Sequence, residues 1–361
     1  MTPIERVLDL ARWAPSGDNT QPWRFALVAP AEAIIYTFDT RSHCVYDLTG
    51  GPSQIAVGAL LETIRIAAST LRMRSEIERL RTPTEESLQF RVRLIGDDSV
   101  QADALADFIL ERCTDRRPFS RRPATPAEKD ALEASVGTRH RIIWFEGPKR
   151  RSMARLMFDS SKIRLTIPEA YAVHREVIEW HARTSETKIP DQAVGLDPLG
   201  LVLMRWAMQS WLRTRILGSY FGGTLLPRLQ LELMPGMRCA AHFLICAMAP
   251  ANGVDDYLRA GAAVQRFWLT AERLGLRHQP EMTPLIFAGY AREGRRFTDV
   301  SSAVERAHWV ARRLTVLAGR EAAETAVWMG RIGVGSRPSA RSLRRPLSDL
   351  LILPRAPLEI G

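Results

Sequence analysis

Short polar and turn-forming residues are concentrated near the N-terminus, at positions 14–23, in the sequence APSGDNTQPW. The first proline stops a preceding helix, the glycine lets the backbone approach a ligand closely, and the serine, asparagine and glutamine supply hydrogen-bonding groups. A flat heterocycle with several polar edge atoms would suit this segment. An ordinary connection from helix to strand has the same composition, so the residues alone leave both interpretations open. The candidate binding residues are Pro15, Ser16, Gly17, Asn19 and Gln21.

Arginines around a hydroxyl residue form a second candidate site, Arg112-Cys113-Thr114-Asp115-Arg116-Arg117. Their guanidinium groups and the threonine could supply a fork of donors to a phosphate dianion, whose geometry guanidinium matches well. Another basic pair, Arg344 and Arg345, stands before a proline near the C-terminus. Solvated basic loops have the same composition, and this alternative stays open at both places.

Several familiar catalytic patterns are absent from the sequence. It contains no GxGxxG or GxxxxGK[ST] phosphate loop and no GxSxG elbow, which argues against Rossmann, P-loop and hydrolase assignments. His174 and His181 lie seven residues apart without an HExxH arrangement, and the four cysteines form no CxxC pair. We therefore expect no metal site.

The distribution of charged and apolar residues limits the classes of partner that the protein could bind. The formal net charge is +10, but the cationic residues are scattered among acidic ones, without the sustained basic run of a nucleic-acid groove. The most apolar stretch, 199–217, is interrupted by arginines and falls short of the ~18 uninterrupted apolar residues of a membrane span. The N-terminus lacks the pattern of a signal peptide. We expect neither a nucleic-acid nor a membrane partner, and a cytoplasmic location.

Hydrophobic periodicity predicts helices and strands in alternation around these segments. In the first third we expect a helix after Thr2, strands near 23–28, 33–38 and 88–95, and a long helix over 53–71. Farther along, the pattern predicts helices over 101–111, 126–135, 150–164, 168–183, 254–275 and 302–318, two apolar helical pieces between 199 and 234, and strands over 241–248, 284–289 and 324–332.

Two long helical segments resemble each other at a constant separation. Residues 57–71 align with residues 260–274, with identical residues at Gly58 and Gly261 and at three further pairs. The dipeptide Thr-Pro at 2–3, followed by a glutamate, likewise resembles the Thr-Pro at 125–126. These similarities indicate an internal duplication, although any two amphipathic helices share part of such a pattern.

The motifs taken together resemble those of the nitroreductase superfamily of FMN-dependent oxidoreductases. The segment at 14–23 is similar to the family's APSxxNxQPW motif, and residues 261–276 are similar to its central helix, GAxxQxxxLxAxxxGL. Residues 112–119 resemble the RRSxRxF motif that holds the FMN phosphate, with Cys113 departing from the usual second arginine. In this chain that motif follows the APSxxNxQPW segment, whereas in the family it normally precedes it.

The resemblance and the reversed order imply a fused pseudo-dimer. We expect an α+β, nitroreductase-like fold in which two fused halves, residues 1–105 and 106–361, surround antiparallel-rich sheets and long central helices. In the family, one subunit supplies the phosphate-binding arginines and the other supplies the Pro-Ser turn. Here the first half lacks the arginine motif, and the turn of the second half, at 135–139, is degenerate. One complete flavin site is therefore expected, in a chain that is a monomer or a homodimer.

The resemblance also assigns roles to residues and implies a reaction. It places Arg112, Thr114 and Arg116 at the phosphate, with Arg344 and Arg345 completing that site, and Gln279, Glu281 and Met282 beside the flavin ring. Arg116 is also the candidate for stabilising charge at the flavin N1/O2 edge. No side chain need act as a nucleophile or base, because the cofactor carries the chemistry.

The reaction implied is hydride transfer from NAD(P)H through FMN to an electron-poor small molecule such as a nitro compound or a quinone. An FMN-storage protein is the alternative, favoured by the apolar insertion at 184–237, whose tryptophans at 206 and 211 could cover the flavin as a lid. An extra packing layer or an oligomer contact would explain that insertion equally well. A biosynthetic oxidase or flavin-cleaving enzyme on the same fold is a third reading.

Overall fold

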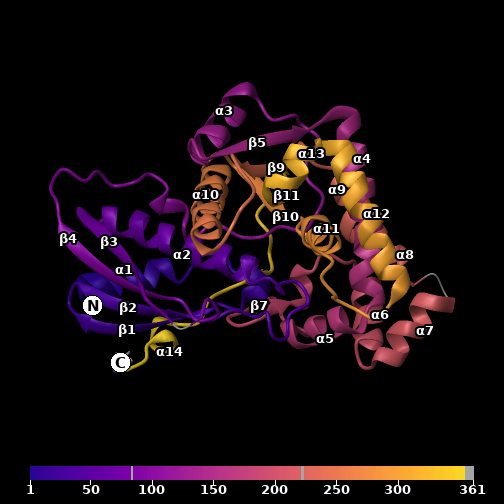
Figure 1. Ribbon diagram of the computed structural model, residues 1–361, viewed down its shortest axis with the longest axis horizontal. Coiled ribbons are helices and arrows are strands. Elements are labelled where there is room, and N and C mark those ends of the chain that lie inside the picture. The colour runs from indigo at the N-terminus through magenta and orange to yellow at the C-terminus, as the bar shows by residue number, and fades with distance from the viewer. Residues whose placement is uncertain (83, 221–222, 354–361) are drawn as a thin grey trace.

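Two four-stranded antiparallel sheets form the frame of the molecule in the computed structural model, which describes residues 1–82, 84–220 and 223–353 (Figure 1). The first third of the chain forms one sheet and its helices, in the order α1 (Pro3–Ala11), β1 (Trp23–Ala29), β2 (Glu32–Thr37), α2 (Gly51–Ser69), β3 (Met73–Leu80) and β4 (Gln89–Gly96). The second sheet and its helices follow as α3 (Pro126–Ser135), β5 (His140–Phe145), β9 (Ala241–Ala247), α10 (Val254–Arg273), β10 (Leu276–Pro280) and β11 (Ala326–Val334).

The two sheets have the same topology. The first has the spatial order β1-β2-β4-β3 and the second has the order β5-β9-β11-β10, with every neighbouring pair antiparallel. In both sets a helix precedes the first strand and the long helix, α2 or α10, connects the second strand to the third. The leading helices α1 and α3 both begin at a threonine that forms a capping box with a glutamate.

The two sets of sheet and helices differ in the additional segments that lie between their shared elements. Between β5 and β9 lie α4 (Gly147–Thr166), α5 (Pro168–Val177), β6 (Ile178–Glu179), β7 (Thr184–Ser185), β8 (Ile189–Pro190), α6 (Pro198–Ala207), α7 (Trp211–Tyr220), α8 (Leu225–Arg228), a π-helical turn (Leu229–Leu233) and α9 (Met234–Met237). Between β10 and β11 lie α11 (Thr283–Glu293), α12 (Ser301–Ala318) and α13 (Arg320–Thr325).

The central helices α2 and α10 pack against each other at glycines (Figure 1). A Cβ added at Gly261 would lie 2.1 Å from the Ile55 carbonyl oxygen, and one at Gly58 would lie 2.1 Å from the Leu258 carbonyl oxygen. Ile55 of α2 belongs to a hydrophobic core of the second sheet, while Val254 of α10 belongs to the core of the first. The cores of the two sheets therefore meet at α2 and α10, and Gly58 and Gly261 permit the close approach of these helices.

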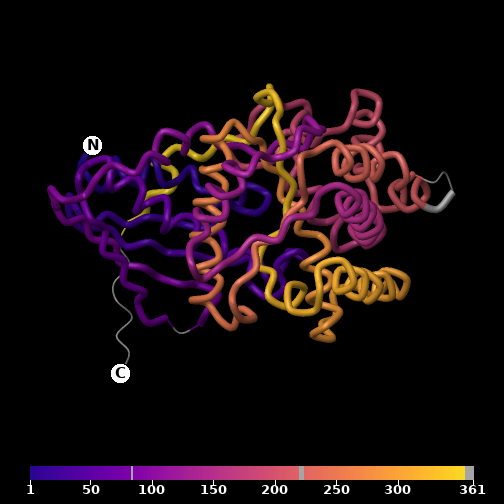
Figure 2. Tube along the Cα trace, turned by 90° about the horizontal axis from the view of Figure 1, so that it is seen from above, coloured from indigo at the N-terminus to yellow at the C-terminus, as the bar shows by residue number. Residues whose placement is uncertain are grey.

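The last described part of the chain returns to the first sheet. After β11 it forms β12 (Arg341–Ser342), paired with β7, and α14 (Leu347–Leu350) beside β1. The Ile352 amide donates to the Phe25 carbonyl oxygen. Figure 2 shows this yellow segment running back along the indigo N-terminal third. Residues 347–352 thus pack against the edge strand β1 of the first sheet.

Several sequence-based expectations were wrong in detail. The apolar run at 284–289 is part of helix α11 and not a strand, because a short buried run has no periodicity that separates the two. The helix expected over 101–111 is reduced to a 3-10 turn at Ala106–Phe108, and the helix expected over 168–183 ends at Val177. The strands β3 and β10 lay outside the predicted elements.

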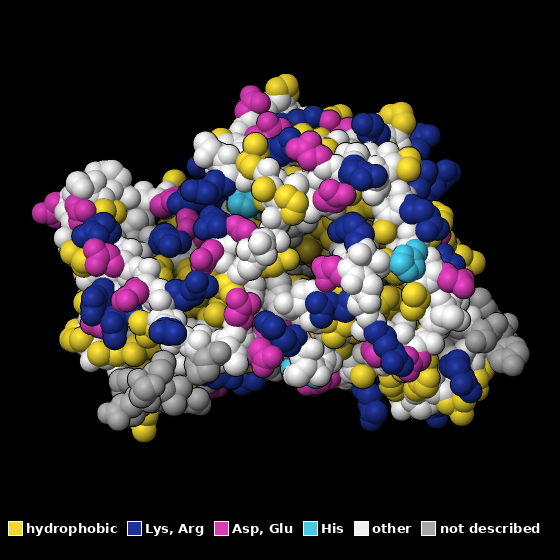
Figure 3. Space-filling model, viewed as in Figure 1, with side chains coloured by type: hydrophobic (Ala, Val, Ile, Leu, Met, Phe, Trp, Pro, Cys, Tyr) yellow, Lys and Arg dark blue, Asp and Glu magenta, His cyan; other side chains and the backbone are white. Residues whose placement is uncertain are grey.

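The surface face in Figure 3 carries interspersed cationic and acidic side chains. Many of the arginines are ion-paired with acidic side chains on neighbouring segments. Among the described residues, no helix is both long enough and apolar enough to cross a membrane.

Candidate functional site

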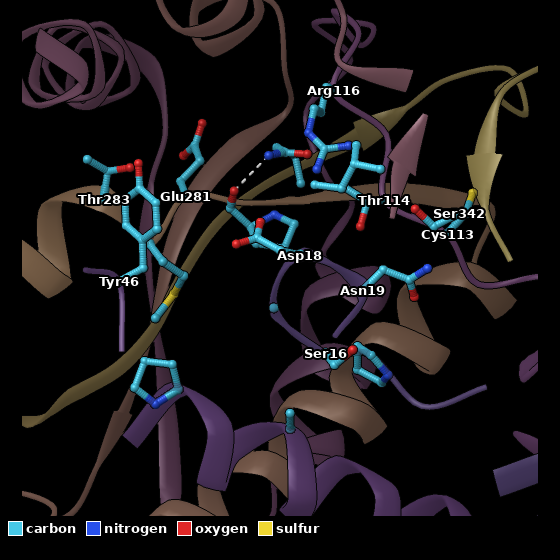
Figure 4. Close-up of a pocket in the computed structure, with 18 of the residues that line it drawn as sticks. Ser16, Asp18, Asn19, Tyr46, Cys113, Thr114, Arg116, Glu281, Thr283 and Ser342 are labelled. Carbon is cyan, nitrogen blue, oxygen red and sulfur yellow. Dashed lines mark hydrogen bonds between the residues drawn. The ribbon is translucent and has the colours of Figure 1, made fainter. Parts of the chain in front are cut away.

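A cavity of about 370 Å³ is lined by residues from distant parts of the chain. The first third contributes the turn at 15–19, Tyr46 and residues of α2, and the rest contributes residues 112–116, α10 and the segment 279–283. Figure 4 shows Asp18, Thr114 and Arg116 projecting toward the same space from segments far apart in the sequence, with Tyr46, Glu281 and Thr283 on its other side. The cavity wall therefore depends on elements associated with both sheets.

The polar turn after α1 has an unusual backbone. Asp18, Asn19 and Gln21 all have positive φ angles, of 50°, 62° and 49°. Asparagine and aspartate tolerate this left-handed region better than other side chains with a Cβ. The Ser16 hydroxyl oxygen accepts a hydrogen bond from the Gln21 amide at 3.0 Å, which closes the turn. Strained backbone of this kind is concentrated at ligand sites.

Asn19 fixes this turn to the insertion. Its amide nitrogen donates to the carbonyl oxygens of Glu186 and Lys188 at 3.2 and 3.3 Å. Its amide oxygen is buried without a hydrogen-bond partner among the described residues. Because buried polar atoms are rarely left unpaired, this oxygen marks a place where a ligand donor would be stabilised.

Two predicted binding residues lie elsewhere. Gln21 is fully buried behind the turn, where its side chain donates to the Glu186 carbonyl and accepts from the Arg345 amide. Arg345 contributes its backbone to this junction, and its carbonyl oxygen accepts from Arg12. Neither side chain lines the cavity. Their role is to fasten the C-terminal segment to the turn, a tertiary contact that the motif does not reveal.

Three arginines gather at one end of the cavity, where Arg112 and Arg344 are buried and Arg341 is partly buried. Arg112, Arg341 and Arg344 donate only to backbone carbonyl oxygens: Arg112 to Trp13 at 2.7 Å, Arg344 to Ala14 at 3.1 Å, and Arg341 to Leu110 at 2.9 Å. None forms a salt bridge with a described carboxylate. Burial lowers the pKa of Arg112 to about 10, and burial together with its arginine neighbours lowers that of Arg344. An anion would relieve this repulsion.

The arginine end also holds unpaired donors. The Nε atoms of Arg112 and Arg341 are buried without hydrogen-bond partners among the described residues. The Arg112 guanidinium lies 4.7 Å from the centre of the Trp268 ring, which packs it in place. Thr114 lies on the cavity wall, where its backbone pairs with His278 of β10. These groups form a cradle of donors with the chemistry that a phosphate requires.

Arg116 lies in a different part of the cavity from this cluster. Its guanidinium donates to the Ala193 carbonyl at 3.1 Å and is electrostatically coupled to Asp18 and Arg164. Arg164 is paired with Glu232 at 2.5 Å. Burial raises the pKa of Asp18, although both arginines oppose that change. This part of the cavity therefore contains mixed charge, with an ion pair at Arg164, whereas the arginines at the other end form no salt bridge and interact with Glu272 only at longer range.

Tyr46 and His174 form a neutral pair on the cavity wall. The Tyr46 hydroxyl lies 2.9 Å from His174 Nε2, and the two rings are stacked. Burial lowers the pKa of His174 to about 3, so the imidazole is neutral at neutral pH, and burial raises the pKa of Tyr46. No sequence motif marked this pair, since the two residues are separated by 128 positions.

A buried charge network supports the segment after β10. Glu281 lies 2.6 Å from His242 Nδ1 and 3.3 Å from Arg331 Nε. Arg331 in turn donates to the carbonyl oxygens of Arg116 and Arg117, so it holds the backbone of the arginine motif. Gln279, Glu281 and Met282 all line the cavity. The supporting residues His242 and Arg331 were missed because their partners come from distant strands.

The interaction of His242 with Glu281 is expected to make the stability of the protein depend on pH. Although burial opposes the charge, Glu281 and Cys239 raise the pKa of His242 to about 10. A raised folded-state pKa stabilises the protein below the unfolded value near ~6.5, and that stabilisation is lost as pH rises toward ~10. We expect the unfolding free energy of the native chain, relative to that of His242→Gln, to fall by up to ~1.4 kcal/mol per pH unit across this range. Chemical denaturation of both proteins at several pH values measures this difference. If their unfolding free energies changed with pH in the same way, the raised pKa of His242 would be contradicted.

The insertion covers part of the cavity, but not with the residues expected. Ile189, Ala193, Val194, Leu231 and Glu232 line the wall. Trp206 is 44% exposed, and Trp211 packs against Tyr171. Neither tryptophan lines the cavity, so the expectation that they occupy the space over the flavin was wrong. The aromatic content of the insertion did not indicate which of its faces points inward.

The other predicted binding residues converge on the cavity wall. They come from four separate segments of the chain and are Pro15, Ser16, Gly17, Asn19, Arg112, Thr114, Arg116, Gln279, Glu281, Met282 and Arg344. Residues on the same wall that the sequence did not predict as binding residues include Asp18, Tyr46, Arg164, His174, Trp268 and Arg341.

Comparison with known proteins gives a family match and several similar sequences. Residues 2–75 match the model of the Nitroreductase family. "Uncharacterized protein MT1398" of Mycobacterium tuberculosis (strain CDC 1551 / Oshkosh) is 26% identical over 302 residues, which cover 82% of this chain and 41% of that protein. "Putative NAD(P)H nitroreductase acg" of Mycobacterium tuberculosis (strain ATCC 25618 / H37Rv) is 30% identical over 142 residues, or 37% of this chain and 40% of that protein. The chain thus spans about two fifths of the length of these curated relatives.

A solved structure, the nitroreductase-like family protein from Bacillus cereus, aligns with 70% of this chain and 97% of its own at 11% identity, with a TM-score of 0.35.

Proposed function

Since the chain belongs to the nitroreductase superfamily, we propose that it is an FMN-dependent oxidoreductase that passes hydride from NAD(P)H to an electron-poor small molecule of nitro or quinone type. The observation that carries this proposal is the cluster of Arg112, Arg341 and Arg344, three cations of which two are buried and none forms a salt bridge with a described carboxylate. Such a cluster is unfavourable unless an anion occupies it, because each charge is desolvated beside like charges.

The residues of the cavity fit FMN at both ends of that molecule. The arginine end offers unpaired guanidinium donors to a phosphate, while Asn19 and Gln279 each carry a buried, unpartnered amide oxygen that suits the N–H or O–H groups of a flavin. When bound, FMN would supply the acceptance and donation of hydride. The chain itself binds the phosphate, excludes water from the cavity and supplies positive charge through Arg116.

We assign this site to two fused halves, residues 1–105 and 106–361. The shared strand order, the paired capping boxes and the glycine contact of α2 with α10 support this division. The connection from α1 to β1 spans residues 12–22 and forms the cavity turn, whereas the connection from α3 to β5 spans only residues 136–139. The second connection is too short to repeat the turn, which supports one flavin site per chain.

Anaerobic addition of NADPH to the flavin-loaded protein tests the proposed activity. We expect the visible absorbance of the flavin to bleach within seconds and to return when an excess of a nitroaromatic compound or a quinone is added. A flavin that stays oxidised with NADPH and NADH, but is reduced by dithionite, would favour storage over turnover.

A further inference from the structure

A second cavity, of about 220 Å³, adjoins the first and is enclosed largely by the insertion. The two cavities share part of their walls, so they lie side by side. The shared residues are Asp18, Arg116, Arg164, His174, Ile189, Val194 and Leu231. We call the second cavity the side chamber.

Beyond this junction, the described wall of the side chamber is apolar except for Thr214 and Thr224. It is formed mainly by α5, α6, α7 and α8, with side chains that include Leu203, Met204, Ala207 and Leu217. The hydroxyl of Thr214, which also lies on this wall, donates to the Ala207 carbonyl oxygen at 2.9 Å and is therefore already engaged. A hydrocarbon would fit this wall, whereas ribose or phosphate groups would lose their hydrogen bonds to water there.

The junction itself is polar. Arg116 and Arg164 present guanidinium groups beside Asp18, and each arginine is already held by the insertion, through the Ala193 carbonyl or the Glu232 carboxylate. The arrangement suits a ligand with a hydrogen-bonding head at the junction and an apolar tail in the side chamber. The cationic cluster at Arg112 and Arg344 is not part of the side chamber wall, so the phosphate end and the tail end are separate.

We propose that the side chamber binds the hydrocarbon tail of the electron acceptor, a quinone whose ring bears an alkyl or isoprenoid chain. This inference rests on the proposed function and narrows its substrate class. At about 30 Å³ for a group of the size of water, a volume of about 220 Å³ accommodates roughly seven carbons. In the overall reaction the quinone gains a hydride equivalent from NAD(P)H and a proton from solvent, which gives the hydroquinone and NAD(P)⁺.

A series of 2-alkyl-1,4-naphthoquinones with chains of one to ten carbons tests the proposal. Each methylene that enters the side chamber is expected to lower KM about fourfold, the change that ~0.8 kcal/mol per buried CH₂ gives. The decrease in KM should stop near seven carbons, when the side chamber is full. A KM independent of chain length would overturn the proposal.

Variants on α6 locate the effect. Ala207→Phe fills the side chamber and should remove most of the decrease in KM that long chains produce. Val202 is 59% exposed on the same helix, so Val202→Phe adds similar bulk outside and should leave the whole series unchanged. Met204→Ala enlarges the side chamber, so KM should continue to decrease up to a longer alkyl chain than in the native protein. An effect of Ala207→Phe on KM for NADPH, with none on the quinone series, would overturn the assignment.

Calorimetric titration of the same quinones into the oxidised, flavin-loaded protein separates this inference from the proposed function. Affinity that rises with chain length, and that Ala207→Phe abolishes, supports the tail site whether or not the protein turns over. Turnover of quinones with affinities independent of chain length would retain the proposed function and contradict the tail site.

Discussion

Replacing Arg344 with alanine is expected to weaken FMN binding by about 1.5–3 kcal/mol, which is the usual contribution of a hydrogen bond to a charged group. Arg344 is 8% exposed and lines the arginine end of the cavity beside Arg112 and Arg341. Arg112→Ala should have a loss of the same size. Fluorescence titration of the flavin-free protein with FMN measures both.

The neighbouring arginine provides the matched control. Arg345 has its side chain outside the cavity, so Arg345→Ala should bind FMN like the native protein. Riboflavin, which lacks the phosphate, should bind the native, Arg112→Ala and Arg344→Ala proteins with similar affinities. Equal losses for FMN and riboflavin would mean that these variants disturb the fold and that the cluster does not bind phosphate.

A second large effect is expected at the contact of the central helices. In Gly261→Ala the new Cβ would lie 2.1 Å from the Ile55 carbonyl oxygen, a backbone atom that cannot move away alone. The helices must separate, which disturbs both hydrophobic cores, and we expect a loss of about 3 kcal/mol or more in unfolding free energy. Chemical denaturation measures this loss, and flavin content should fall with it because both helices line the cavity.

Gly289→Ala is the control for this substitution. Gly289 lies within helix α11, and a Cβ there would meet no atom within 4 Å. Alanine in an unobstructed helical position should stabilise the protein by about 0.5–1 kcal/mol. If both glycine variants were neutral, the central helices could not be packed as closely as the structure has them.

Local motifs predicted those parts of the site whose residues are close in sequence. The turn at 15–19 and the arginine motif at 112–116 could be identified because each lies within one short segment that resembles a family motif. The junction around Arg164 and His174 could not, since the tyrosine that contacts His174 is at position 46 and tertiary packing brings them together. Gln21 shows the opposite error, because a motif does not reveal which side of a turn a polar side chain faces.

For the fold, too, elements with a clear local sequence pattern were predicted, whereas strands without such a pattern were missed. The long helices and the first strands have clear periodicity and were predicted near their observed bounds. The missed strands β3 and β10 occupy the equivalent edge position in the two sheets. In β3 the exposed face carries Arg74, Glu76 and Glu78, which are paired with charges nearby. Such a charged edge strand lacks the hydrophobic signal that sequence analysis relies on.

Flavin stoichiometry tests the central claim, that one chain forms one composite flavin site from both of its halves. The measurement is the amount of FMN released on denaturation from flavin-saturated protein, per chain, with the oligomeric state determined by light scattering. We predict one FMN per chain, whether the chain is a monomer or a homodimer. Two FMN molecules per chain, or one shared between two chains, would contradict the composite site.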